Sequence, residues 1–407
     1  MEMKKYKLGE LMDVTRGQSL SGEYYSKSGN LVRLTLGNFD YHNNCFKDDK
    51  SKDNLYFTGS VKKEFILKKD DIITPLTEQA IGLLGSTAKI PCSGKYIQSQ
   101  DVALIKCNKK LNPDFAFYLI PSKIVRNQLS AAAQQTKIRH TSPDKIKDCS
   151  VWVPEYSEQE KIGKLLSRID EKISINRQIN RNLEELAKQI YDYWFVQFDF
   201  PNEEGKPYKS SGGKMVYNEL LKREIPEGWE VKLLKDIIEI KRGITITEKQ
   251  TTSGTIKVVA AGLTYSYLHG ESNRTPNCIT VSGSGANAGF VNFWREPIFA
   301  SDCSTIQFDN DIDTILCYYT LKKQEKRFYQ ISHKSAQPHI LPSDIGEIPM
   351  IIPSNSIKER ISQFFIKTNI QIAEYTKELE HLSSLRDNLL PLLMNGQVTL
   401  NSCLSHD

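Results

Sequence analysis

Several signatures of membrane insertion, metal binding and catalysis are missing from this chain of 407 residues. It contains no run of about 18 apolar residues, the length that a membrane span requires. The N-terminus also lacks a charged region followed by an apolar stretch, so we expect no signal peptide. The eight cysteines are far apart, without a Cys-x-x-Cys pair or a nearby pair of histidines. We therefore expect a cytoplasmic protein that binds no membrane and whose cysteines are buried thiols.

The common catalytic and nucleotide-binding motifs are also absent. Gly82, Gly85 and Gly94-Lys95 loosely resemble a phosphate loop, but Tyr96 stands where Ser or Thr would bind magnesium. The glycine-rich run 282–289 has no helical pattern behind it, so it does not fit a dinucleotide site. None of the seven histidines lies near a Ser or Cys in a nucleophile motif. We expect no catalytic residue, no bound metal and no bound cofactor on this chain.

The charge balance permits nucleic-acid binding without requiring it. Lys and Arg number 54 against 49 Asp and Glu, giving a net charge of +5. A basic surface would therefore have to come from clustering of the cations. With 39% hydrophobic and 25% charged residues, the composition is that of a soluble protein of two or three domains.

The most informative feature of the sequence is an internal duplication. Pro154, Ser157, Glu160 and Ile162 recur 199 positions later as Pro353, Ser356, Glu359 and Ile361. Towards the N-terminus the repeat continues, with the offset growing to 226 at the most distant pair. These further matches are Arg16-Gly17 with Arg242-Gly243, Asp101 with Asp302, and Gln135 and Ile138 with Gln337 and Ile340. A smooth change of offset is what deletions in surface loops of one copy would leave.

Each copy begins with a strand-rich segment, which we call a head. β-branched or alternating runs predict strands at 31–36, 71–74, 101–107, 256–260, 277–281 and 305–308. Helical spacing of apolar residues predicts one helix at 113–129 and its counterpart at 312–331.

A long helix follows each head. Ser157 with Glu160, and Ser356 with Glu359, predict capping boxes at the two helix starts. From there a seven-residue apolar repeat runs for about 36 residues, on the order of 50 Å. We expect the two helices to pack on each other, and the alternative is that each covers only its own sheet. The predicted interhelix positions are Ile162, Leu165, Ile169, Leu183, Leu186 and Ile190 on the first helix, and Ile361, Phe364, Tyr375, Leu382, Leu385 and Leu389 on the second.

The predicted fold class is α+β, with two similar mixed, strand-rich heads and two long antiparallel coiled-coil-like helices in a pseudo-two-fold internal repeat. The stretch 201–228 is rich in Pro, Gly, Ser and Lys and is predicted to be a linker. The expected divisions are a head at 1–155, a spacer helix at 156–200, the linker at 201–228, a head at 229–352, a spacer helix at 353–398 and a tail at 399–407.

Specific runs of residues resemble the specificity subunit of type I restriction-modification enzymes over nearly the whole chain. These runs are 194–199 (WFVQFD) after Ala187, 386–396 (RDNLLPLLMNG), 229–233 (WEVKL) and 337–340 (QPHI). The first head departs from the last pattern, with Gln135-Thr136-Lys137-Ile138 in place of the proline-histidine version.

This resemblance implies a division of labour. Each head would be a target-recognition domain that reads one half of a split sequence in double-stranded DNA, and the helices would fix the gap. The chain itself would be non-catalytic and would dock two methyltransferase subunits. S-adenosylmethionine, Mg and ATP would be bound by the partner subunits, and the sequence leaves open whether two restriction subunits join.

Polar, glycine-rich or basic loops supply the donors and acceptors that major-groove recognition needs. The predicted DNA-binding residues are Arg33, Gln79, Lys137, Arg139 and His140 in the first head, and Arg274, Ser284, Asn287, Lys334, Gln337 and His339 in the second.

Two other classes of function remain open at this point. One is a stand-alone DNA methyltransferase or nuclease with motifs that escape recognition. The other is a coiled-coil assembly protein that binds no nucleic acid.

Overall fold

The computed structural model describes residues 2–49, 51–78, 80, 82–132, 139–332 and 338–400. The chain forms two compact units. The first unit consists of Met1–Ser174 and Glu380–Asp407, and the second of Ile175–Leu379. Each unit thus contains one head together with part of each long helix, whereas the sequence suggested that heads and helices would be separate divisions.

The head of the first unit contains two small four-stranded sheets. One has the order β10-β8-β12-β2, in which all neighbours are antiparallel, and the other has the order β11-β4-β7-β3. The first sheet consists of β2 (Met12–Arg16), β8 (Ile72–Pro75), β10 (Ala88–Lys89) and β12 (Val102–Cys107), and the second of β3 (Tyr25–Ser26), β4 (Val32–Arg33), β7 (Tyr56–Phe57) and β11 (Tyr96–Ile97). Three strand pairs complete the head: β1 (Met3–Lys7) with β14 (Ser150–Pro154), β5 (Phe39–Asp40) with β6 (Cys45–Phe46), and β9 (Thr77–Glu78) with β13 (Arg139–His140).

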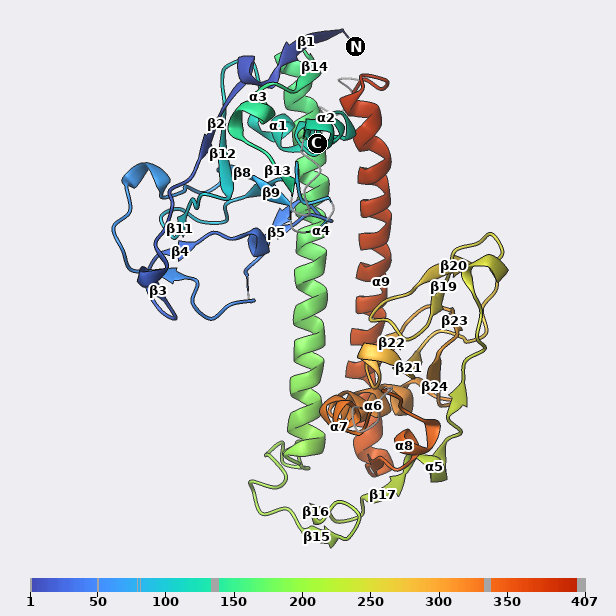
Figure 1. Ribbon diagram of the computed structural model, residues 1–407. Helices are drawn as coiled ribbons and strands as arrows, with labels where there is room; N and C mark the ends of the chain where they lie inside the picture. The colour runs from blue at the N-terminus through green and yellow to red at the C-terminus, as the bar shows by residue number, and fades with distance from the viewer. Residues whose placement is uncertain are drawn as a thin grey trace. The chain divides into compact units, whose positions relative to one another are not determined.

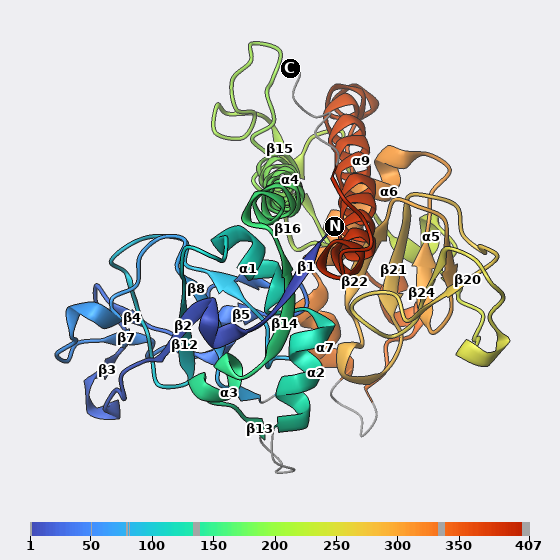
Figure 2. The same cartoon turned by 90° about the horizontal axis from the view of Figure 1, so that it is seen from above.

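The head of the second unit repeats this plan. A four-stranded sheet has the order β18-β24-β21-β22, and a three-stranded sheet has the order β20-β19-β23. Figure 2 shows β21 and β24 side by side, in agreement with their antiparallel register. The four-stranded sheet consists of β18 (Lys241–Arg242), β21 (Cys278–Ser282), β22 (Val291–Trp294) and β24 (Cys303–Ile306). The three-stranded sheet consists of β19 (Ile256–Val259), β20 (Tyr267–His269) and β23 (Ile298–Ala300), and these three strands lie together in Figure 1. A further pair joins β17 (Glu230–Leu233) to β25 (Pro349–Ile352).

The helices of the two heads also correspond. The first head has α1 (Pro113–Leu119), α2 (Lys123–Ala132) and α3 (Pro143–Lys147), and the second has α5 (Leu234–Ile237), α6 (Asp311–Lys322), α7 (Glu325–Ser332) and α8 (Pro342–Gly346). Each helix predicted at 113–129 and 312–331 is therefore two helices. Asn112 caps α1 and Asn310 caps α6, each with a side-chain oxygen that accepts from amides of the first turn.

Short helical turns connect these elements. They are η1 (Leu8–Glu10), η2 (Gly22–Tyr24), η3 (Leu36–Asn38), η4 (Lys63–Phe65), η6 (Glu248–Gln250) and η7 (Gly285–Asn287).

The two long helices, α4 (Tyr156–Tyr191) and α9 (Asn355–Met394), contact each other in both units. In the second unit, Asn176 Nδ2 donates to Glu378 at 2.7 Å and Asn180 Nδ2 donates to Thr376 at 3.1 Å. In the first unit, Ile162 and Leu166 of α4 share a buried cluster with Leu393 and Met394 of α9. From Asn176 to Asn180 the residue number rises along α4, while that of the partner residue falls from Glu378 to Thr376 along α9. The two helices are therefore antiparallel in the second unit. The prediction of a mutual seam is confirmed, and the alternative of separate helices is wrong.

One of the two apolar rows of this seam differs from the predicted row by one residue. The row that starts at Ile162 and Ile361 is confirmed, with Ile169 also buried. The second row is Leu166, Ile173 and Ala187 on α4 and Phe365, Ile372 and Leu393 on α9, all of them buried. Leu186 and Leu385 were predicted to pack and are instead 43% and 39% exposed. The remaining predicted positions are half-buried, namely Leu165, Leu183, Ile190, Phe364, Tyr375, Leu382 and Leu389.

A helical repeat of seven residues explains this error. Steps of three then four, and of four then three, both add up to seven, so the period alone does not choose between them. Moving a row by one residue rotates it by about 100° around the helix. Packing against the partner helix and the head decides which row is buried.

The capping boxes predicted at the helix starts are wrong. The carbonyl of Glu155 already accepts from the amides of Glu158 and Gln159 at 3.0 and 3.1 Å, and the carbonyl of Ser354 accepts from Lys358 at 3.0 Å. The residue whose carbonyl accepts the first helical bond is the N-cap. Ser157 and Ser356 consequently lie inside the first turn, each two positions after the N-cap.

The stretch 201–228, which was predicted to be a linker, contains regular structure. β15 (Met215–Asn218) pairs with β16 (Arg223–Pro226), and Tyr208 stacks on Phe200 at a ring-centroid distance of 4.7 Å. Arg223 lies 4.6 Å above the ring of Phe198 and donates to the carbonyls of Phe195 and Val196, which belong to the π-helical turn η5 (Asp192–Val196). Aromatic packing supplies the order that the composition did not predict.

The cysteine prediction holds only in part. Cys149, Cys278, Cys303 and Cys317 are buried, whereas Cys92 is exposed. Cys45 and Cys107 are half-buried, and Cys403 lies outside the described residues. Among the helices of the described ranges, none is long and apolar enough to cross a membrane.

Candidate nucleic-acid interface

The registers of the four-stranded sheets show which residues of the two heads are equivalent. In the first head Val102 pairs with Pro75, and in the second Cys303 pairs with Ser282. Val102 and Cys303 directly follow the repeated Asp101 and Asp302. Counting on from Pro75 and Ser282, Thr77 is the counterpart of Ser284.

Just after the strand that contains Pro75 or Ser282, the backbone of each head pairs with the segment that leads into α3 or α8. In the first head Thr77 pairs with His140, and in the second Ser284 pairs with His339. The neighbouring backbone bonds match as well: Thr141 N donates to Leu76 O at 2.9 Å, and Ile340 N donates to Gly283 O at 3.0 Å. We call this place in each head the strand crossing, and it consists of Thr77, Asp101 and His140 in the first head and of Ser284, Asp302 and His339 in the second.

This geometry corrects the sequence alignment of the repeat. Ile340 was matched with Ile138, but its structural counterpart is Thr141. His140 and His339 are therefore equivalent, at the same offset of 199 that relates the helices. Gln135, Ile138 and Gln337 lie outside the described residues. The first head has Arg139-His140 where the second has Pro338-His339, so the two heads share the histidine and Arg139 stands in place of the proline.

In both strand crossings a hydroxyl donates to an aspartate. The Ser284 hydroxyl donates to Asp302 in a short hydrogen bond. The Thr77 hydroxyl donates to Asp101 at 3.3 Å and also lies 3.3 Å from Nδ1 of His140. Both histidines and both aspartates are exposed. The structure thus brings the predicted Ser284 and His339 together, and places the predicted His140 at the equivalent point.

Arg139 lies beside the strand crossing of the first head. Its Nη1 is 3.6 Å from the carboxylate of Glu78 and donates to Ser130 at 3.0 Å. Glu78 is nearly buried and accepts from the amide of Gly82 at 2.9 Å. Arg139 is itself exposed, so part of its guanidinium remains available to a phosphate or a base edge.

Arg33 was predicted to bind DNA, but it lies in the short strand β4 and its side chain is buried. It is only 8% exposed, stacks 3.9 Å from the ring centre of Tyr25 and donates to Asn54 at 3.4 Å. It lines a polar cavity of about 360 Å³, which Asp49 and Asp101 also line. Burial raises the pKa of Asp49, but hydrogen bonds from Ser51 and Thr35 outweigh it and the net pKa is lowered.

Arg274 is bound into the second head through all three guanidinium nitrogens. Nε donates to Thr305 at 2.8 Å, Nη1 to the carbonyl of Asn273 at 2.7 Å and Nη2 to the carbonyl of Arg242 at 3.1 Å. Bidentate binding of a guanine would have to compete with these bonds. The geometry indicates that Arg274 ties strand ends together.

Asn287 lines an open, largely apolar hollow of about 430 Å³ at the glycine-rich loop of the second head. Tyr329, Lys326 and Leu263 line the same hollow. An exposed aromatic ring with a neighbouring cation is a common arrangement at nucleic-acid surfaces. Four other predicted residues, Gln79, Lys137, Lys334 and Gln337, lie outside the described residues.

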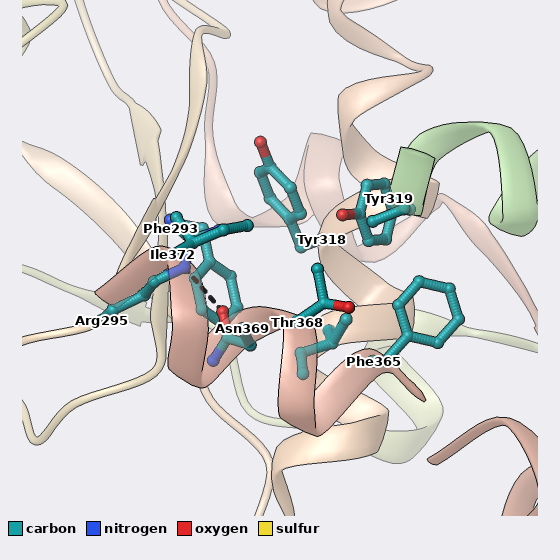
Figure 3. Close-up of a pocket in the computed structure, with 10 residues that line it drawn as sticks. Phe293, Arg295, Tyr318, Tyr319, Phe365, Thr368, Asn369 and Ile372 are labelled. Carbon is teal, nitrogen blue, oxygen red and sulfur yellow. Dashed lines mark hydrogen bonds between the residues drawn. The ribbon is translucent and has the colours of Figure 1, made fainter. Parts of the chain in front are cut away.

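A second, small cavity in the second unit belongs to helix packing. It encloses about 10 Å³, room for about one water, and Arg295, Asn369 and Phe365 are among its lining residues. Figure 3 shows the bond from Arg295 Nε to Asn369, which is 2.7 Å long. Burial lowers the pKa of Arg295, while Glu184 at 4.0 Å acts in the opposite direction. Arg295 therefore links the head to both long helices within this unit.

Sequence reasoning missed the two aspartates as site residues. Asp101 and Asp302 were recognised only as repeated positions, since a single Asp before a strand is usually part of a turn. Their pairing with Thr77 and Ser284 depends on residues 24 and 18 positions away. Among the described residues, no group of three or more His, Cys, Asp or Glu could hold a metal ion.

The comparisons with known proteins agree with one another. Residues 1–185 and 226–381 match the family described as type I restriction modification DNA specificity domain. The chain is 23% identical to the type I restriction enzyme HindI specificity subunit of Haemophilus influenzae, over 98% of this chain and all of that protein. It is also 23% identical to the type I restriction enzyme MjaIX specificity subunit of Methanocaldococcus jannaschii, over 70% of this chain and 69% of that protein.

A solved structure shows the same fold. The type I restriction-modification S subunit from M. genitalium superposes with a TM-score of 0.66 at 18% identity, over 97% of this chain and 96% of that chain. The family match covers both heads and most of both long helices. The chain therefore belongs to the family of type I restriction-modification specificity subunits, whose role is DNA recognition.

Proposed function

We propose that each head of this chain reads one half of a gapped, double-stranded DNA site, and that α4 and α9 set the length of the gap. The observation that carries this proposal is the repeated strand crossing, in which a hydroxyl donates to an aspartate in both heads. Two equivalent reading surfaces in one chain suit a site with two separated halves. The continuous lengths of α4 and α9, 36 and 40 residues, suit a spacer.

The chain performs no chemistry in this proposal. Two methyltransferase subunits dock on it and bind S-adenosylmethionine, and restriction subunits that use ATP and Mg join them in a complete restriction enzyme. The name and coverage of the relatives support a role as one subunit among several.

Replacing one head tests the assignment of heads to half-sites. A chain whose residues 1–155 are exchanged for those of another specificity subunit is expressed with its methyltransferase partner, and genomic methylation is mapped by sequencing. We expect a gapped motif in which one half changes and the other stays. A motif that keeps both halves would contradict the proposal.

Two biochemical measurements separate this proposal from its alternatives. Incubated alone with DNA, Mg and S-adenosylmethionine, the chain should neither cut nor methylate, and either product would favour a stand-alone enzyme. Retention on DNA at about 0.1 M salt, lost as salt rises, is expected for a reader that contacts phosphates. Lack of retention at any salt concentration, alone and with the methyltransferase, would favour an assembly protein.

A further inference from the structure

The hydroxyl group at each strand crossing uses its only proton in a hydrogen bond to a carboxylate. Ser284 donates to Asp302 in the second head, and Thr77 donates to Asp101 in the first. We propose that the hydroxyl–carboxylate pair at each strand crossing is an acceptor-only reader that recognises an exocyclic amino group, N6 of adenine or N4 of cytosine, in the major groove. This inference rests on the proposed function and adds the chemistry of one contact in each half-site.

In the second head, the acceptor-only character follows from the number of protons and lone pairs on Ser284 and Asp302. A serine hydroxyl has one proton and two lone pairs, and an ionised carboxylate only accepts. With the proton of Ser284 directed at Asp302, the pair presents only lone pairs to a ligand. Asp302 is exposed and Ser284 is half-buried, so DNA could reach these oxygens.

The first head reaches the same polarity through its aspartate and its histidine. Thr77 is only 8% exposed, so Asp101 and His140 are the accessible members. With the Thr77 proton donated to Asp101, the contact of 3.3 Å between Thr77 Oγ1 and His140 Nδ1 is a hydrogen bond in the tautomer that carries the proton on Nδ1. In a neutral imidazole the other nitrogen, Nε2, is then an acceptor. His140 therefore also offers DNA a lone pair.

An acceptor-only group distinguishes base contacts from backbone contacts. Phosphate oxygens are themselves acceptors and carry negative charge, so the carboxylate of Asp302 or Asp101 repels them. In the major groove each base pair has one exocyclic amino group, on adenine or on cytosine. An acceptor at a fixed place thus favours A over T, and C over G, on the strand that it faces.

The Asp302→Asn variant tests the polarity directly. Asn can donate from its amide to Ser284 or to DNA, so the pair gains a donor that it lacked. We expect one position of the second half-site to change preference from A or C towards T or G, whose O4 and O6 accept. The expected change in relative affinity is about tenfold, within the usual range for one base contact. The first half-site should be read as before.

The measurement uses the full chain assembled with its methyltransferase subunits. Binding is measured on synthetic duplexes that carry each of the four bases at every position of both halves, starting from the motif mapped for the parent chain. Ser284→Ala should flatten the preference at the same position, and Ser284→Thr should retain it. Asp309→Asn removes one exposed negative charge from the same head and should leave every preference unchanged.

An atomic substitution in the DNA gives a second measurement. At the position that responds to Asp302→Asn or Ser284→Ala, adenine is replaced by purine, or cytosine by pyrimidin-2-one, both of which lack the amino group. The parent should lose about tenfold in affinity, and Ser284→Ala should lose almost nothing.

The outcomes separate this inference from the proposed function. A parent that recognises no gapped motif would overturn the proposed function. A parent that recognises one, with the same order of base preferences in Asp302→Asn and Ser284→Ala, would overturn only the acceptor-only reader. If Asp302→Asn does not fold, the comparison of Ser284→Ala with Ser284→Thr decides, and equal behaviour of the two overturns the inference.

Discussion

Removal of the Asp170 side chain should destabilise the first unit strongly. One carboxylate oxygen of Asp170 lies 3.0 Å from Nη1 of Arg386 on α9, and the other accepts from the Tyr118 hydroxyl at 2.6 Å. The Arg386 side chain is 12% exposed and that of Asp170 is 27% exposed. Asp170 thus links the head, α4 and α9 within this unit.

The size of the effect follows from the groups left behind. Burial lowers the pKa of Arg386, but the charges of Asp170 and Asp387 outweigh this and the net pKa is raised. In Asp170→Ala, Arg386 keeps Asp387, and Tyr118 loses the charged acceptor of its hydroxyl. Breaking a buried pair usually costs about 3–5 kcal/mol. Because Asp387 remains, we expect about 3 kcal/mol in the free energy of unfolding.

Urea denaturation combined with hydrogen exchange can measure this. With a slope of about 2 kcal/mol per M, the loss corresponds to a midpoint lower by about 1.5 M. Peptides from 156–174 and 380–394 should lose amide protection, because they contain Asp170 and Arg386. Tyr118→Phe, which removes one charged hydrogen bond, should cost about 2 kcal/mol.

A surface ion pair in the same head provides the control. Asp53 lies 2.6 Å from Lys27, but both side chains are more than two-thirds exposed. Solvent screens such a pair, so Asp53→Ala should hardly change the midpoint. If Asp170→Ala lowered the midpoint no more than Asp53→Ala does, the buried network would not stabilise the unit as reasoned.

Three further predictions concern packing and reactivity. Gly17→Ala and Gly243→Ala should each cost about 1–3 kcal/mol in their own unit, because a Cβ at either position would clash with a backbone carbonyl; unchanged urea midpoints would contradict this. Leu393→Ala, at a buried seam position, should lower the free energy of unfolding by about 2–5 kcal/mol, whereas Leu385→Ala should lower it far less. Equal urea midpoints for the two variants would instead support the row predicted from the sequence. In the folded chain at pH 8, iodoacetamide should alkylate Cys92 much faster than the buried thiols, as measured by peptide mass mapping, and comparable rates would refute the burial. Burial raises the pKa of these thiols, to about 12 for Cys278 and Cys303 and about 11 for Cys149, so little thiolate forms below those values.

The relation between the two heads has a consequence for engineering the specificity that we propose for them. Thr77 and Ser284 are equivalent by register, and so are His140 and His339. Substitutions at one strand crossing can therefore be transferred to the other by structure, although the local sequences differ. Arg33 and Arg274 are poorer targets, because the first is buried and the second is bound by three intramolecular partners.

The sequence by itself determined the features that depend on repetition and periodicity. The recurrence of Pro154 as Pro353 identified two copies, and the row that begins at Ile162 and Ile361 identified the first face of each long helix. These features could be predicted because a repeat and a helical period are properties of the order of residues along the chain. The family resemblance also rested on contiguous runs, such as that at 194–199.

Only the tertiary structure decided the features that depend on contacts between distant segments. Leu166 is buried and Leu165 is only partly buried because the partner helix and the head pack against that side of α4. The seven-residue period does not decide which of the two residues is buried. Asp302 meets Ser284, and Asp101 meets Thr77, because a sheet places strand ends together that are far apart in the chain. A hydrogen bond between such segments has no signature in the order of residues, and neither does the polarity that it imposes on the groups that we propose face DNA.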